Sequence, residues 1–134
     1  MWAHYAASHR GFCLGFYPDR VGALYGAQPV NYSEDYPEVS FLNDSEEEVV
    51  RRMMATKSQQ WQYEAEWRVI DSDRGPGLRE FSNTALREVI FGLRMTEEDK
   101  LAIRDALRRG GQSPLLLQAL KSENEYELVF ELAG

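Results

Sequence analysis

The stretch "LREVIFGLRMTEEDKLAIRDALRRGGQSPLLLQALK", residues 86–121, contains two apolar segments on either side of a segment with helical periodicity. The apolar segments, 86–92 and 115–121, are short and rich in branched residues, which is typical of buried strands. The helical segment begins at Thr96, an N-cap residue followed by three acidic side chains, and a glycine pair ends it. This stretch therefore predicts a strand, a helix and a strand in succession.

The rest of the chain supplies further strands and one more helix. Strands are predicted at 12–17, 29–33, 62–71 and 125–132, and a helix at 46–56. In that helix we expect Val49, Val50, Met53 and Met54 to form a core-facing stripe. The order of elements predicts a single α+β domain over residues 1–134, with a mostly antiparallel sheet and two main helices.

Composition restricts the class of protein. The chain has 134 residues and a net charge of −7, which argues against a nucleic-acid partner because phosphate backbones need a basic surface. No run of eighteen apolar residues is present, so we expect no membrane span. The N-terminus lacks the pattern of a secretory signal, and the single cysteine, Cys13, fits a reducing compartment. We therefore predict a cytoplasmic protein.

The segment "WQYEAEWRVI", residues 61–70, places two glutamates between aromatic residues. On the predicted strand Glu64, Glu66 and Arg68 share one face, and Tyr63 and Trp67 share the opposite, core-facing side. The two carboxylates would lie about 6.5–7 Å apart along the strand. One interpretation is a solvated face with a weak Glu66–Arg68 pair.

The other interpretation is a catalytic cleft. Two nearby carboxylates raise the pKa of one of them, and they stabilise positive charge that develops on a sugar. Trp61 and Trp67 would offer flat surfaces on which a ring could stack. The sequence alone leaves both interpretations open.

The N-terminal segment "MWAHYAASHR" holds the only two histidines, His4 and His9. They are five residues apart and match no zinc-binding pattern, so we expect no metal site. Their more common role is in packing or hydrogen bonding.

The chain resembles the domain-of-unknown-function family 2971, through two long motifs. The first is W-x-H-Y-A-x-x-H-x-G-F, which falls on Trp2, His4, Tyr5, Ala6, His9, Gly11 and Phe12. The second is K-x-x-x-W-x-Y-E-x-E-W-R, which falls on Lys57, Trp61, Tyr63, Glu64, Glu66, Trp67 and Arg68. The segments "VNYS" and "VIFGLRMTEEDK" also match. Family members carry a further N-terminal segment, so we expect this chain to be a truncated member.

The resemblance implies a bacterial protein similar to those of abortive-infection systems, which act in phage defence. A weaker similarity, at the level of the fold, is to ADP-ribosyltransferase toxins, in which a glutamate begins a late apolar strand. It implies a partial fold of that type that uses NAD as substrate and transfers ADP-ribose to an acceptor macromolecule. Glu66 and Glu64 would then be catalytic, and the substrate or cofactor would be bound by His4, Tyr5, His9, Arg10, Lys57, Trp61 and Arg68.

Two alternatives remain at this point. The first is a non-catalytic binding or regulatory module in which the motif residues form a structural polar network. The second is a nuclease whose carboxylates, Glu64 and Glu66 with Asp71 or Asp73, would hold Mg²⁺. The sequence does not decide whether the chain is an enzyme, and it leaves the oligomeric state open.

Overall fold

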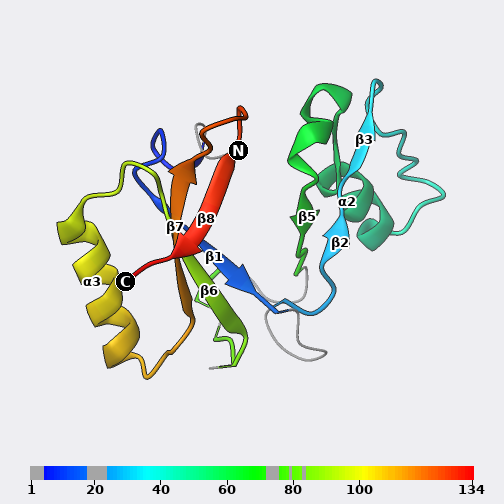
Figure 1. Cartoon of the computed structure of the whole chain (residues 1–134). Coiled ribbons are helices and arrows are strands. Elements are labelled where there is room, and N and C mark those ends of the chain that lie inside the picture. The colour runs from blue at the N-terminus through cyan, green and yellow to red at the C-terminus, as the bar shows by residue number, and fades with distance from the viewer. Residues whose placement is uncertain (1–4, 18–23, 72–75, 79, 83) are drawn as a thin grey trace. The chain divides into compact units, whose positions relative to one another are not determined.

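The computed structural model describes residues 5–17, 24–71, 76–78, 80–82 and 84–134 (Figure 1). The chain forms two compact units. Unit 1 comprises residues 1–17 and 81–134, and unit 2 comprises residues 18–80. The predicted α+β class is confirmed, because helices and a mixed sheet both occur.

Unit 1 is a four-stranded sheet with one long helix. Its elements are β1 (Phe12–Phe16), β6 (Leu86–Phe91), α3 (Glu97–Arg109), β7 (Leu115–Lys121) and β8 (Leu128–Leu132). The strand order is β1-β6-β7-β8. The β1–β6 and β7–β8 pairs are antiparallel, whereas β6 and β7 are parallel and are joined through α3. The mostly antiparallel mixed sheet predicted from the sequence is therefore confirmed.

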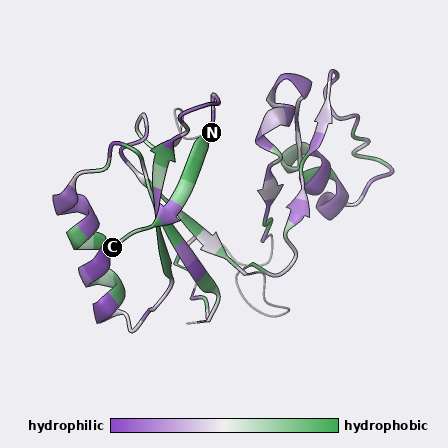
Figure 2. Cartoon of the chain, viewed as in Figure 1, coloured by the Kyte–Doolittle hydropathy of each residue, from purple (hydrophilic) through white to green (hydrophobic). Residues whose placement is uncertain are grey.

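The core of unit 1 lies between α3 and one face of the sheet. Val89 and Phe91 in β6 are fully buried, and Ile103 and Leu107 of α3 pack against this cluster. These two helix residues are four apart, so they lie on the same side of α3. Most charged residues of α3 lie on its other sides, and Figure 2 shows purple and green segments alternating along the helix. Arg104 is an exception, because its guanidinium lies 5.4 Å from the centre of the Phe91 ring.

Gly92, directly after β6, is held tightly against the N-terminal segment. Its N–H donates to the carbonyl of Gly11 at 2.9 Å, and the next turn is fixed by Arg94 N–H, which donates to the carbonyl of His9 at 2.8 Å. A Cβ at residue 92 would lie 2.3 Å from the His9 oxygen and 2.5 Å from the Gly11 oxygen. Only glycine fits this backbone contact.

We therefore predict that Gly92→Ala destabilises the protein by about 1–3 kcal/mol, the range typical of overpacking. Gly110→Ala is the matched control, because a Cβ there meets nothing closer than 3.4 Å. Urea denaturation of both variants measures the difference. Equal stability of the two variants would contradict the close contact at Gly92.

Unit 2 is built from short elements around one helix. They are β2 (Gln28–Pro29), β3 (Asn31–Ser33), α2 (Glu46–Met54), β4 (Thr56–Ser58), the 3-10 helix η1 (Gln59–Glu64) and β5 (Trp67–Arg68). β2 pairs with β5 in antiparallel fashion, and β3 pairs with β4 in parallel fashion. The single strand predicted at 29–33 is thus divided at the buried residue Val30, whose N–H donates to the carbonyl of Glu66 at 2.9 Å.

Helix α2 starts where the sequence predicts, and a capping box closes its N-terminus. Ser45 accepts from the N–H of Glu48, and the Glu48 carboxylate accepts in return from the N–H of Ser45. The prediction of a core-facing stripe is wrong for most of its members. Only Val49 is buried, whereas Val50 is 40% exposed and both methionines, Met53 and Met54, are more than half exposed. The sheets described in unit 2 have only two short strands each, so they offer little apolar surface for a helix to cover.

The strand predicted at 62–71 is the main error of the sequence interpretation. Residues up to Glu64 belong to η1, and only Trp67 and Arg68 are in a strand. Ala65 lies between them in the left-handed region, with φ of 45°. The prediction that Tyr63 and Trp67 face a core is also wrong, because both rings are mostly exposed. Alternation of side chains does not apply across a 3-10 helix and a left-handed residue.

Candidate functional site: a cluster of four charges in unit 2

Lys57, in β4, holds the two glutamates of the second motif together. Its ammonium group donates to a carboxylate oxygen of Glu64, and it lies 3.1 Å from Oε2 of Glu66. Glu64 is the one buried charged residue among those that the structure describes, with 5% of its surface exposed. With the left-handed turn at Ala65 between them, Glu64 and Glu66 both reach the same cation. The predicted strand only placed the two glutamates on one shared face.

Arg68 completes the cluster from β5. Its Nε lies 2.6 Å from Oε1 of Glu66 and its Nη2 lies 3.1 Å from Oε2, so the guanidinium and the carboxylate form a two-point pair. Another guanidinium nitrogen donates to the carbonyl of Met54, at the end of α2. Arg68 therefore links β5, the residues between η1 and β5, and the end of α2 through one side chain.

The charges of the cluster balance, with two cations and two carboxylates. The Arg68 guanidinium, and after it the Lys57 ammonium, lower the pKa of Glu66 to about 2, against the opposing effect of partial burial. The hydrogen bond to Glu64 is the main reason that the pKa of Lys57 is raised above its usual value. Lys57 and Glu66 are therefore charged at neutral pH.

Two aromatic side chains support the cluster. The Lys57 ammonium lies 5.1 Å from the centre of the Trp61 ring, which is a cation–π contact. The hydroxyl of Tyr32, in β3, accepts from the N–H of Glu66 at 2.8 Å. Tyr32 was not among the predicted site residues, although it lies in the "VNYS" segment that resembles the family.

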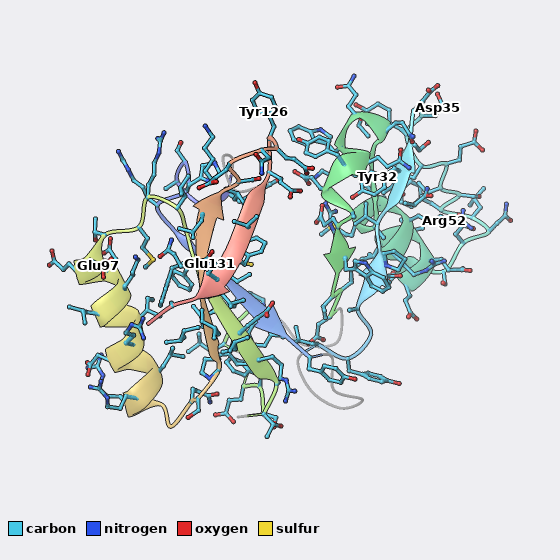
Figure 3. The ribbon with its side chains drawn as sticks, viewed as in Figure 1. Tyr32, Asp35, Arg52, Glu97, Tyr126 and Glu131 are labelled. Atoms are coloured by element: carbon cyan, nitrogen blue, oxygen red, sulfur yellow. The ribbon has the colours of Figure 1, made fainter. Side chains whose placement is uncertain are left out.

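A pocket of about 230 Å³ lies beside the cluster in unit 2. Its wall consists of the end of β3, the residues that follow it and the whole of β4: Ser33, Glu34, Asp35, Tyr36, Pro37, Thr56, Lys57 and Ser58. Figure 3 shows the positions of Tyr32 and Asp35 in this part of the unit. Lys57 thus belongs to both the pocket wall and the ion-pair cluster. No sequence motif marks the acidic and hydroxyl side chains of this pocket, so its position could not be predicted from the sequence.

The structure joins Lys57, Trp61, Glu64, Glu66 and Arg68, which are the predicted site residues of unit 2. The remaining predicted residues belong to unit 1, where Tyr5 and Arg10 are exposed and His4 lies outside the described residues.

His9 ends a run of three residues with positive φ: Ala7 at 47°, Ser8 at 56° and His9 at 69°. Its Nδ1 is buried and has no hydrogen-bond partner among the described residues. Its carbonyl holds the turn after β6, so the contribution of His9 to this turn is made by its backbone.

Within the described ranges, no three histidine, cysteine or acidic side chains are arranged as a metal site. In the same part of the chain, no helix has the length and apolar character needed to cross a bilayer.

The half of the chain that holds the cluster matches a known protein family. The family described as "Protein of unknown function (DUF2971)" matches residues 1–69, and the chain belongs to it. The matched region contains both motifs and the whole four-charge cluster. No curated protein and no solved structure matches the chain.

We predict that replacing the charged side chain of Lys57 by an uncharged one lowers the Tm strongly. Lys57→Met keeps an unbranched side chain that is one atom shorter and removes the ammonium shared by the two carboxylates. Because Glu64 is buried, we expect the Tm to fall by on the order of 10 °C. Differential scanning calorimetry measures the change.

The matched control is Lys100→Met in α3. The Lys100 side chain is 17% exposed, close to the 18% of Lys57, and its ammonium lies 2.7 Å from Glu97. The partner carboxylate differs, because the Glu97 side chain is 82% exposed and remains solvated without the lysine. Such pairs contribute little, and we expect its Tm to stay close to that of the wild type. If both variants lose the same stability, the cluster has no special role.

The cluster also predicts how stability depends on pH. The pKa of Glu66 is lowered from 4.5 to about 2 in the folded state, so its contribution is complete above pH 4.5 and is lost as the pH falls towards 2. Urea denaturation at pH 6, 4 and 3 should show this loss in the wild type. Glu66→Gln removes the titrating group, so that variant should lose less stability over the same range. Parallel curves would show that Glu66 does not carry the acid sensitivity.

Proposed function

We propose that unit 2 is a non-catalytic binding module, in which the four-charge cluster is a structural network that shapes the adjacent pocket. The observation that carries this proposal is that Lys57 belongs both to the ion-pair cluster and to the wall of the pocket. Its ammonium group is held by Glu64 and Glu66, and the strand to which it belongs forms one wall of the pocket. The family motif therefore fixes the geometry of a pocket that lies beside it.

The ligand that suits this pocket is small and rich in hydrogen-bond donors. Its volume of about 230 Å³ is below the roughly 300–1,000 Å³ of pockets that enclose drug-sized molecules. Glu34 and Asp35 supply carboxylates, and the hydroxyls of Ser33, Thr56 and Ser58 complete the polar lining. A sugar ring or a small amine fits these acceptors. A phosphate group would be repelled by the two carboxylates, because the cation of the wall, Lys57, is already paired with Glu64 and Glu66.

The charges of the cluster argue for a structural role. A catalytic carboxylate must contact the reacting atoms, but Glu64 is enclosed and Glu66 is held at both oxygens by cations. Replacing these cations with a substrate would cost the energy of the ion pairs. In a structural role the two glutamates keep Lys57 and Arg68 as their partners, so these ion pairs need not be broken.

An NAD-dependent ADP-ribosyltransferase is the second candidate. The observation that favours it is that Glu66 is ionised, partly exposed and separated by a single residue from Glu64. An ionised carboxylate of this type stabilises positive charge on a ribose. The phage-defence role suggested by the resemblance to abortive-infection proteins is compatible with either candidate.

Thermal-shift titration of the full chain with ribose, adenosine and NAD distinguishes the two candidates. For a binding module we expect ribose or adenosine to raise the Tm by about 2–4 °C at saturation. Glu34→Gln in the pocket should reduce this shift, and Glu47→Gln on exposed α2 is the matched control that should preserve it.

Glu66→Gln should lower the Tm and still respond to the ligand. NAD cleavage by the wild type that Glu66→Gln abolishes without loss of stability would instead support the transferase. If none of the three probes changes the Tm and NAD is not cleaved, then binding of these ligands in the pocket and NAD-dependent transferase activity are both refuted.

A further inference from the structure

Along one edge of the unit 1 sheet, the backbone of β8 presents hydrogen-bonding groups for which the described residues provide no partner. Ala133 N–H donates to the carbonyl of Leu116, and Ser122 N–H donates to the carbonyl of Glu127, so residues 127 and 133 face β7. Alternation then places the N–H and C=O groups of Leu128, Phe130 and Leu132 on the outer side. β8 is the last strand in the sheet order, and no described strand pairs with this side.

This edge lacks the features that usually prevent strands from pairing. Exposed edges are commonly interrupted by lysine, proline or a bulge. The sequence of β8 is LVFEL, and its register with β7 is continuous. Phe130 is 47% exposed and Leu132 is 74% exposed. Figure 2 shows β8 as largely apolar, and in Figure 3 the labelled Glu131 marks its one charged residue.

The pattern of outward groups is symmetric about Phe130. We propose that β8 pairs with β8 of a second copy of this chain, in antiparallel orientation, about a two-fold axis at Phe130. In this register Leu128 lies opposite Leu132 of the second copy, and the two Phe130 residues lie opposite each other. Each of these three pairs forms two hydrogen bonds between the copies, so all the outward groups of the strand are used.

The side chains are complementary in the same register. Leu128, Phe130 and Leu132 lie on one face of the sheet, because they are separated by two residues each, and they meet apolar partners across the axis. Glu131 lies opposite Val129, so no two carboxylates of the strands are directly opposed. The net charge of −7 therefore creates no direct repulsion at the centre of this contact.

A cysteine cross-link tests both the dimer and its register. Cys13 is a free, exposed thiol, so the variants carry Cys13→Ser. In Phe130→Cys the two Cα atoms would be about 5.5 Å apart, which is within the range for a disulfide. In Val129→Cys the two thiols would be offset along the strands, with Cα atoms roughly 8 Å apart. We expect covalent dimers from Phe130→Cys and few from Val129→Cys.

Sedimentation of the unlinked protein over a range of concentrations provides the second measurement. We expect a monomer–dimer equilibrium in the wild type, which Leu132→Lys shifts to monomer. Leu101→Lys is the matched control, because Leu101 is 64% exposed on α3 and lies outside β8. A wild type that is monomeric at every concentration overturns the proposal. Equal cross-linking of the two cysteine variants, or equal effects of the two lysine variants, overturns it as well.

Discussion

Unit 2 depends on the ion pairs that the ammonium group of Lys57 forms with two carboxylates. This ammonium group is shared by Glu64 and Glu66, and Arg68 connects the second of these carboxylates to the end of α2. Unit 2 has few buried apolar side chains, since Val30, Val49 and Ala55 are its buried hydrophobic residues among those described, each 6–8% exposed. With so small a core, the relative positions of its short elements are set mainly by ion pairs and hydrogen bonds.

The same arrangement changes the meaning of the E-x-E pair. Two carboxylates without nearby cations would compete for a proton and suit acid–base chemistry. Here two cations balance two carboxylates, so the cluster favours fully ionised groups and a fixed geometry. In the proposed binding module a ligand would meet the carboxylates and hydroxyls of the pocket wall, and the cluster would hold Lys57, the residue that wall and cluster share, in a fixed position.

The sequence predicted unit 1 well, because its elements follow local rules. Residues 86–121 have clear periodicity and caps, and the structure places β6, α3 and β7 close to the expected ends. It failed at 62–66, where the aromatic pattern imitates a strand but the chain forms η1 and a left-handed turn at Ala65. The motif nevertheless contains the residues that the structure brings together in unit 2, since motif spacing singles out residues even where the predicted backbone conformation is wrong. Their catalytic or binding roles stay predictions. Tyr32 was missed because its partner is a backbone N–H.

The ends of the segment that forms unit 2 are brought together by the sheet. Tyr17 N–H donates to the carbonyl of Ala85 at 2.8 Å, directly beyond the β1–β6 pair. Residues 18–84 therefore form one closed loop whose two ends are joined at the sheet. The entropy of closing a loop grows only with the logarithm of its length. Residues can consequently be gained or lost within this segment over evolution at little cost to the sheet, and the two units are free to diverge at different rates.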